Sequence, residues 1–230
     1  MRALNPSSLP DDCADRLRQA ILDGAFPVGA RLPTERALAE QLGVNRGTLR
    51  AALGRLVAQG LLTVRQGRGY TVLDYRLAGG PELIGTVKAP LAETAADLLL
   101  VRRKLAEAVL ERLAARRPDP QPTLDAIEAF AQAVEQGADS DEIARLDAEV
   151  LLQLLLATDS PVLQLTLNPI RRVLAELPAL REAMYREPRG NVIGWQALAV
   201  WLRSPSPAGI PAILQLLEAR DVQTVQALTP

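Results

Sequence analysis

Hydrophobic and polar positions in the first third of the chain follow the period of three short amphipathic helices. The expected helices span residues 12–23, 35–42 and 46–60. A glycine closes each of them, as is typical of a helix end, at Gly24, Gly43 and Gly60. Side chains that can cap a helix N-terminus precede the second and third helices, at Thr34 and Asn45. The second and third helices are therefore joined by a tight turn.

The third helix has two chemically different faces. Its buried face is expected to consist of Leu49, Ala52, Leu53 and Leu56. Arg46, Gly47 and Arg50 share the opposite face, near the start of the helix. Residues 62–72 then contain two β-rich segments around a glycine-rich tip, which predicts a β-hairpin with two arginines at its tip.

A segment rich in glycine and proline separates the first third from the rest of the chain. It spans residues 76–90 and has room for one short helix. Beyond it, the periodicity predicts helices over 92–117, 123–136, 140–157, 161–176, 178–187, 191–203 and 207–219, with a short closing helix over 221–228. We therefore expect a mainly α chain in three parts: residues 1–76, a linker over 77–91, and an all-helical bundle of about seven helices over 92–230.

The longest charge-poor stretch, residues 150–170, is interrupted by the sequence DSP at 159–161. This favours two buried helices over a membrane span, because Ser160 can cap the second helix and Pro161 can occupy its first turn. Residues 1–12 are polar and contain prolines, unlike the basic and then apolar leader of an exported protein. We therefore expect a cytoplasmic protein without a membrane segment.

The composition excludes several kinds of chemistry. The chain of 230 residues has no histidine and a single cysteine, Cys13. This excludes Ser-His-Asp and Cys-His catalysis, histidine-ligated metal sites and disulfide frameworks. Because no cluster of carboxylates at catalytic spacing stands out either, we expect neither an enzyme nor a bound metal or other cofactor.

The net charge of −1 hides a division between the two parts of the chain. Residues 1–76 contain eleven Arg against seven Asp and Glu, a balance of +4, whereas residues 77–230 carry a balance of −5. A basic first part suits a polyanionic partner. Three helices with a tight turn before the third, followed by a basic hairpin, are typical of a winged helix-turn-helix that binds double-stranded DNA.

In such a domain the start of the third helix faces base edges in the major groove. Arg46 and Arg50 are placed to donate bidentate hydrogen bonds to guanine, and Thr48 or Asn45 could bond a phosphate. Arg65 and Arg68 at the hairpin tip can approach the sugar-phosphate backbone or enter the minor groove. The alternatives are an exposed helix face with an ordinary hairpin turn, or a domain that docks protein, for which arginine and glycine are poorly suited.

Three segments carry a further signal: LPTERALA at 32–39, GVNRGTLRAAL at 43–53 and RQGRG at 65–69. They resemble the DNA-binding domain of the GntR family of bacterial transcriptional regulators. The resemblance extends over nearly all of residues 10–74. It implies that the DNA-contacting positions are Arg36, Asn45, Arg46, Gly47, Thr48, Arg50, Gln66 and Gly67. Gly47 departs from the family pattern, because a serine or threonine often stands at that position.

The all-helical part resembles the effector domain of the FadR subfamily of these regulators. One large branch of such domains binds a divalent metal through an aspartate and three histidines. Asp147 stands where that aspartate is expected, but Leu151 occupies the first histidine position. The resemblance therefore implies a metal-free sensor, similar to the fatty-acid-responsive members, and Asp147 is interpreted as a remnant or a charge on the helix surface.

A small-molecule effector is expected between the helices of the bundle. The candidate effector-binding residues are Arg102, Tyr185 and Trp195. Arg102 points inward if Leu98, Val101 and Leu105 form the core face of its helix, and it can then pair with an acidic effector or, equally well, with an acidic neighbour. Trp195 and Trp201 are more typical of a core than of a ligand wall.

The resulting hypothesis is a homodimeric repressor or activator that reads a pseudo-palindromic operator under control of an effector. A long-chain acyl-CoA, linked to fatty-acid metabolism, and a small organic acid both stay open as effectors. The leucine-rich segments 146–156 and 162–174 suit an acyl tunnel or an ordinary core, and residues 220–224 lack a recognisable acyl-CoA pattern. A helical ligand- or partner-binding module without DNA binding is the alternative of another class.

Overall fold

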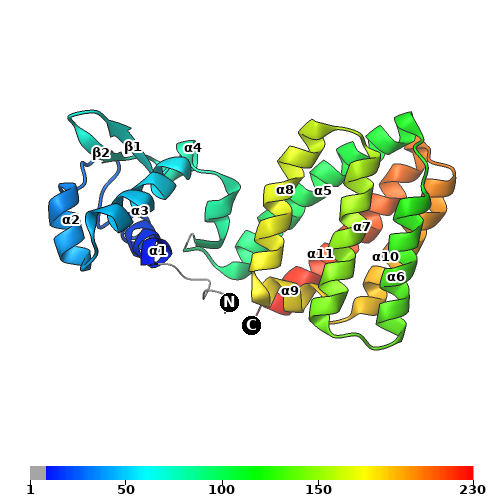
Figure 1. The fold of residues 1–230 in the computed structure, drawn as a ribbon. Coiled ribbons are helices and arrows are strands. Elements are labelled where there is room, and N and C mark those ends of the chain that lie inside the picture. The colour runs from blue at the N-terminus through cyan, green and yellow to red at the C-terminus, as the bar shows by residue number, and fades with distance from the viewer. Residues whose placement is uncertain (1–8, 87, 230) are drawn as a thin grey trace, which may run out of the picture. The chain divides into compact units, whose positions relative to one another are not determined.

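The computed structural model describes residues 9–86 and 88–229. The chain divides into two compact units, Met1–Lys88 and Ala89–Pro230, each of which has its own hydrophobic core. The described parts are helical apart from one two-stranded sheet and one isolated β-bridge (Figure 1). None of the described helices is long and apolar enough to cross a membrane.

The first unit is a winged helix-turn-helix. Its helices are α1 (Leu9–Leu22), α2 (Glu35–Leu42) and α3 (Arg46–Ala58), and its antiparallel hairpin consists of β1 (Leu62–Arg65) and β2 (Gly69–Val72). The hairpin register pairs Leu62 with Val72 and Arg65 with Gly69, and an isolated bridge joins Arg31 to Thr71. The helix α4 (Tyr75–Ala78) and the 3-10 helix η1 (Pro81–Thr86) end the unit.

Local sequence signals account for the turn between α2 and α3. The Thr34 hydroxyl accepts from the Ala37 N–H at 3.3 Å, and the Asn45 side chain accepts from the Thr48 N–H at 2.8 Å. Both caps agree with the expectation from sequence, since each satisfies an N–H that the first turn of a helix leaves free. The predicted apolar face of α3 is also confirmed, because its four members are fully buried: Leu49, Ala52, Leu53 and Leu56.

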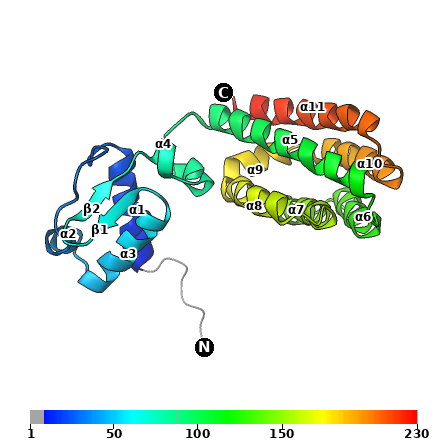
Figure 2. The ribbon, with the colours of Figure 1, turned by 90° about the horizontal axis from the view of Figure 1, so that it is seen from above.

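The second unit is a helical bundle. Its helices are α5 (Leu91–Arg116), α6 (Gln121–Glu135), α7 (Ser140–Ala157), α8 (Pro161–Glu176), α9 (Pro178–Met184), α10 (Pro188–Arg203) and α11 (Ile210–Leu228), with the 3-10 turn η2 (Pro207–Gly209) before the last. The first and last helices, α5 and α11, pack against each other along their length, and α6 packs against both α7 and α10 (Figure 2). The mainly α architecture predicted from sequence is thus confirmed.

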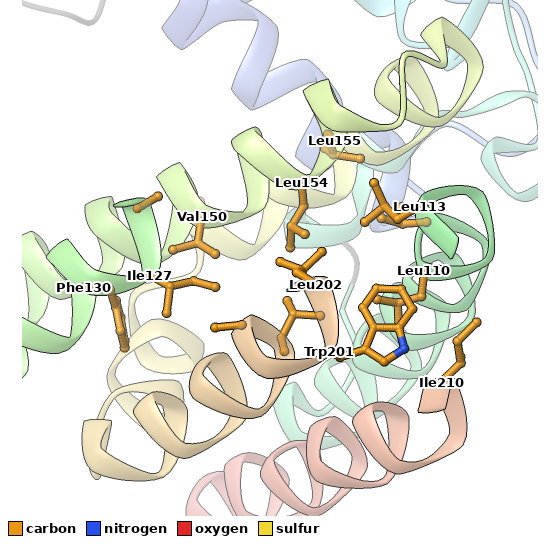
Figure 3. Packing of buried hydrophobic residues seen from close by; sticks show 14 of the residues in the cluster. Leu110, Leu113, Ile127, Phe130, Val150, Leu154, Leu155, Trp201, Leu202 and Ile210 are labelled. Atoms are coloured by element: carbon orange, nitrogen blue, oxygen red, sulfur yellow. The ribbon is translucent and has the colours of Figure 1, made fainter. Parts of the chain in front are cut away.

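The core of the bundle brings together side chains from distant parts of the sequence. Leu110 and Leu113 of α5 meet Val150 and Leu154 of α7 and Trp201 of α10 (Figure 3). Phe130 is fully buried where α6 joins this cluster. Burial of large aliphatic and aromatic side chains is the main favourable contribution to the free energy of folding, so this cluster fixes how the helices pack.

Two expectations about the bundle are wrong. The sequence predicts separate helices over 207–219 and 221–228, but α11 continues without a break through Arg220 and Asp221. The charged pair does not form a loop because the Asp221 carboxylate is buried in an ion pair with arginines of α5. The predicted core face of α5 also fails at Val101, which is 48% exposed, whereas Leu98 and Leu99 are buried.

One backbone contact fixes the end of the first unit to the turn after α3. Gly60 has φ of +71°, and a Cβ atom added there would overlap the carbonyl oxygen of Ala78 at the end of α4. Gly24 has a similar φ of +79°, but an added Cβ would meet nothing within 4 Å. The two glycines therefore have comparable backbone strain on substitution, and only Gly60 has a steric clash in addition.

We expect Gly24→Ala to lower the free energy of unfolding of the first unit by about 1–2 kcal/mol, from the left-handed backbone alone. Gly60→Ala adds the clash with a rigid backbone carbonyl and should cost more than about 3 kcal/mol. Urea unfolding of the full chain, followed by circular dichroism, measures both losses. Equal losses in the two variants would contradict the close approach of Gly60 to Ala78.

Candidate nucleic-acid interface and ligand cavity

The N-terminal end of α3 presents the side chains that sequence analysis singled out. Arg46 and Arg50 are exposed, as are Asn45 and Gly47, while Thr48 is half-buried. The first turn of α3 contains no acidic residue. Arg36 is exposed at the start of α2, the other helix of the motif. These residues make one end of the helix-turn-helix basic and accessible.

Two features of this surface were not predicted, the ion pair of Arg50 and the closeness of Gly47 to the Asn45 cap. The Nε–H of Arg50 donates to Oε2 of Glu35 at 2.8 Å, and this bond with the Glu35 carboxylate raises the pKa of Arg50. The Asn45 oxygen is occupied by its capping bond, and a Cβ at Gly47 would lie only 3.2 Å from that oxygen. Glycine at position 47 therefore leaves the cap undisturbed where the family often has serine or threonine.

The wing adds a second cationic surface. Its tip residues Arg65, Gln66, Gly67 and Arg68 are all exposed. Arg31, which joins Thr71 through the isolated bridge, borders a shallow groove of about 420 Å³ together with Arg65 and Arg68. Arg31 was missed by sequence analysis because nothing in its neighbourhood predicts pairing with a hairpin forty residues later.

The second unit encloses a cavity of about 160 Å³ between α5, α7, α8, α10 and α11. Most of its lining is aliphatic, with leucines from all five helices. Five charged residues also line it: Arg102, Asp147, Arg171, Arg220 and Asp221. The cavity therefore combines a large apolar wall with a few charges, which is the usual composition of a small-molecule site.

Asp147 is buried at 6% exposure, so its interpretation as a surface charge is wrong. Its carboxylate accepts from the Tyr185 hydroxyl at 2.9 Å and from Nε1 of Trp195 at 2.7 Å. Burial raises the pKa of Asp147, and the two hydrogen bonds oppose that shift. Burial and the neighbouring Asp147 charge also raise the pKa of Tyr185, which stays a neutral donor.

The surroundings of Asp147 do not fit a divalent metal. Each carboxylate oxygen already accepts a hydrogen bond from an aromatic side chain, and Leu151, one turn further along α7, lines the cavity with a side chain that offers no ligand. The hydrogen bonds from Tyr185 and Trp195 instead satisfy the buried carboxylate from within the protein.

Arg102 points inward and is paired with a neighbour. Its guanidinium bonds to the Asp221 carboxylate of α11, which also accepts from Nη1 of Arg103 at 2.9 Å. Glu218 forms a further ion pair with Arg103 at 3.1 Å. Burial raises the pKa of Asp221, against the lowering effect of the two arginines. The acidic partner that sequence analysis left open is therefore Asp221.

The structure also places two unforeseen arginines in the cavity wall. Arg171 of α8 donates to the carbonyl oxygen of Ala148 at 3.0 Å, and Arg220 of α11 donates to that of Met184 at 3.0 Å. Their sequence context gave no signal, because helical periodicity places a long side chain on a face without showing which neighbour that face meets. Trp201, as expected, belongs to the core, whereas Trp195 lines the cavity.

Replacing the buried Asp147 by asparagine should alter the pH dependence of stability. Because the pKa of Asp147 is raised in the folded state, the folded protein holds this proton more tightly than the unfolded chain does. The wild-type protein therefore loses stability, by up to about 1 kcal/mol per pH unit, as the pH rises from the unfolded pKa through the folded one. The amide of the asparagine variant has no proton to lose in this range.

We expect the difference in Tm between Asp147→Asn and the wild type to move in favour of the variant as the pH rises from the unfolded pKa of about 4 through the raised folded pKa, measured by calorimetry between pH 4 and pH 8. Asp97→Asn, at an exposed position of α5, is the matched control and should follow the wild-type curve. Parallel curves for wild type and Asp147→Asn would contradict the raised pKa.

Comparison with known proteins assigns each of the two units to a known domain family. The first matches the family model "Bacterial regulatory proteins, gntR family" over residues 10–72, and the second matches the FCD domain over residues 97–229. Among solved structures, a Listeria monocytogenes protein, Lar, has a TM-score of 0.64 at 14% identity, with 98% of each chain covered. Escherichia coli McbR/YncC has a TM-score of 0.51 at 22% identity, covering 96% of this chain and 98% of its own, so both share the fold.

Three relatives are similar in sequence. The fatty acid metabolism regulator protein of Edwardsiella ictaluri is 30% identical over 74% of this chain and 70% of its own length. The protein of the same name from Haemophilus influenzae is 27% identical over 81% and 77%. An HTH-type transcriptional regulator of Mycobacterium tuberculosis is 40% identical over 59% of this chain, a match that spans 54% of that relative. The chain belongs to the GntR family and is a DNA-binding transcriptional regulator with an FCD effector domain.

Proposed function

We propose that the protein binds its operator through the basic end of the helix-turn-helix and the wing, and that a fatty acyl compound in the bundle cavity controls this binding. The observation that carries the first half is the exposed cluster of cations at the start of α3, without an acidic residue in its first turn. A helix N-terminus with exposed arginines suits the major groove, where arginine recognises guanine.

Each predicted DNA-binding residue has a part in this proposal. Arg46 and Arg50 read base edges, and Thr48 with Asn45 contacts phosphate at the start of α3. Gly47 permits close approach of the helix to the bases. Arg36 and the wing contact the backbone flanking the groove, the wing through Arg65, Gln66, Gly67 and Arg68. Glu35 holds Arg50 in the absence of DNA and would have to share it with a base in the complex.

We further propose that the protein acts as a homodimer on a pseudo-palindromic operator in the cytoplasm, where bacterial DNA lies. Two winged units related by two-fold symmetry would then occupy two half-sites. In the described chain α8 leaves apolar side chains in water, with Val162 at 73% and Leu165 at 71% exposure. A second copy is the partner that we propose for this surface.

A long-chain acyl-CoA is the effector that we propose first. Two relatives over most of the chain are named fatty acid metabolism regulators, and the aliphatic lining of the cavity suits an acyl chain. A small organic acid is the second candidate. A volume of about 160 Å³ favours it, because a compact anion would fill that space and could pair with Arg171 and Arg220, the lining arginines without an ion pair in the described structure.

The DNA-binding half is tested by Arg46→Ala. We expect about tenfold to a hundredfold weaker binding to the promoter region of the protein's own gene, measured by fluorescence anisotropy, because a base contact is lost. Wild-type affinity should also fall steeply with salt as phosphates are neutralised. Arg16→Ala removes an exposed arginine from α1 as the matched control and should stay within about twofold of wild type. Equal affinities of the two variants would contradict the proposal.

The effector half is tested by native mass spectrometry of the full chain after incubation with palmitoyl-CoA or a short carboxylate. We expect a species of two chains, twice 24.8 kDa, carrying palmitoyl-CoA. A monomer would refute the dimer. Retention of the short carboxylate together with failure to retain palmitoyl-CoA would replace the first effector candidate by the second.

A further inference from the structure

We infer that Arg171 and Arg220 form an anion-binding site inside the cavity, which holds the acidic group of the ligand. The inference rests on the proposed function for the presence of an effector, but it concerns one chemical feature that either effector candidate would share. It is carried by the hydrogen bonding and charge balance of the cavity wall.

Arg171 is a half-buried cation whose hydrogen-bond partner in the described structure is neutral. Its Nη2 donates to the carbonyl oxygen of Ala148 at 3.0 Å, while its Nε is buried and has no hydrogen-bond partner. No described carboxylate forms an ion pair with it. Burial lowers the pKa of Arg171, and the charge of Glu149, which forms no ion pair with it, opposes that shift. A ligand anion would supply the missing partner.

Arg220 has the same deficiency on another helix. Its guanidinium donates to the Met184 carbonyl, to the side-chain oxygen of Asn191 and to Gln223, all of which are neutral acceptors. Its Nε is buried without a partner, and among the described residues it has no ion pair. Gly190 leaves space for it, because a Cβ added there would lie 2.6 Å from Nη1. The half-buried guanidinium is thus held in place by neutral neighbours, and the carboxylates whose charges act on it, Glu187, Asp147 and Asp221, form no ion pair with it.

The cavity as a whole has an excess of positive charge. Three arginines and two aspartates line it, which leaves one positive charge in excess even when both aspartates are ionised. Arg102 is compensated by Asp221, so the excess falls on Arg171 and Arg220. Partly burying a charge without an ion pair is costly, and charged groups of this kind in a cleft are candidates for a functional site.

The geometry of guanidinium groups identifies the ligand group as a carboxylate or a phosphate. Both groups present oxygens that match the planar N–H donors of arginine. The carboxylate would come from a free fatty or short organic acid, and the phosphate from the coenzyme A part of an acyl-CoA. The apolar remainder of the cavity would hold the hydrocarbon part of either ligand.

The test compares Arg171→Gln and Arg220→Gln with Arg172→Gln, an exposed neighbour on α8 that removes the same charge outside the cavity. Binding of palmitate, palmitoyl-CoA and palmitoyl-pantetheine to the full chain is titrated by calorimetry. Thermal shifts with acetate and inorganic phosphate probe the anion alone. Palmitoyl-pantetheine carries the chain without an anion, so it separates contacts with the head group from contacts with the tail.

We expect Arg171→Gln and Arg220→Gln each to weaken the anionic ligand at least tenfold and to abolish the shift caused by the simple anion. Arg172→Gln should behave as wild type, and palmitoyl-pantetheine should bind all variants equally. If the two substitutions weaken palmitate more than palmitoyl-CoA, the anion that the arginines bind is a carboxylate. If they weaken palmitoyl-CoA more, it is a phosphate. The Tm of the ligand-free variants should fall little, because each variant loses hydrogen bonds to neutral acceptors but no ion pair of the described structure.

Three outcomes would overturn the inference. They are an unchanged affinity of both cavity variants for the anionic ligands, a loss of affinity for palmitoyl-pantetheine as large as that for the anionic ligands, and a wild-type protein that responds to no anion. The first of these outcomes leaves the acyl-CoA proposal intact. In a further outcome, the wild-type protein does not bind palmitoyl-CoA but responds to acetate or phosphate, and the two variants lose that response. This outcome would refute the acyl-CoA proposal and support the anion site. Gly190→Ala, which displaces Arg220 while keeping its charge, should reproduce part of the loss if either glutamine variant fails to fold.

Discussion

The buried ion pair between α5 and α11 is the interaction on which the architecture of the second unit depends. Asp221 accepts hydrogen bonds from two consecutive arginines, Arg102 and Arg103, more than a hundred residues earlier in the chain. This fixes the first and last helices of the bundle side by side, and the cavity lies against them. Loss of the carboxylate would leave Arg102 without an ion-pair partner and Arg103 with Glu218 alone, which is far more costly than loss of an exposed pair.

Charged residues of the cavity wall fall into two groups, those paired within the protein and those left for a ligand. The charge of Arg102 is paired with Asp221 within the protein, and Asp147 is satisfied by two aromatic donors, Tyr185 and Trp195. What remains in the wall is a pair of cations with neutral partners. The bundle therefore has a fixed polar framework around an apolar space, and its selectivity comes from the few groups that the framework leaves without a counter-charge.

Local signals explain how much of the fold was predictable from sequence. Thr34, Asn45 and Ser160 cap helices as expected, because a capping side chain and the backbone that it satisfies are three residues apart. The hairpin and the apolar face of α3 follow from equally short-range periodicity. The family resemblance predicted the order of the two units but left open a helical module that does not bind DNA, and the match of both units to family models decides for the DNA-binding regulator.

The contacts that sequence could not supply are all long-range pairings of charged or polar groups. Arg50 meets Glu35 across the helix-turn-helix, Asp147 is covered by Tyr185 and by Trp195 of α10, and Asp221 keeps α11 continuous where the sequence predicts a break. Helical periodicity predicts that a polar residue is exposed, because the partner that would let it be buried lies elsewhere in the chain. The two unpaired arginines of the cavity were overlooked for the same reason.

The position of the tryptophans has a practical consequence. The chain contains two, and they have different surroundings: Trp201 is enclosed by the apolar core, whereas the indole N–H of Trp195 bonds to a buried carboxylate in the cavity wall. Indole emission responds to nearby charge and to water, so a change in the cavity acts on one of the two fluorophores and leaves the other as an internal reference. The protein thus carries a built-in optical reporter of its own effector site, which needs no label.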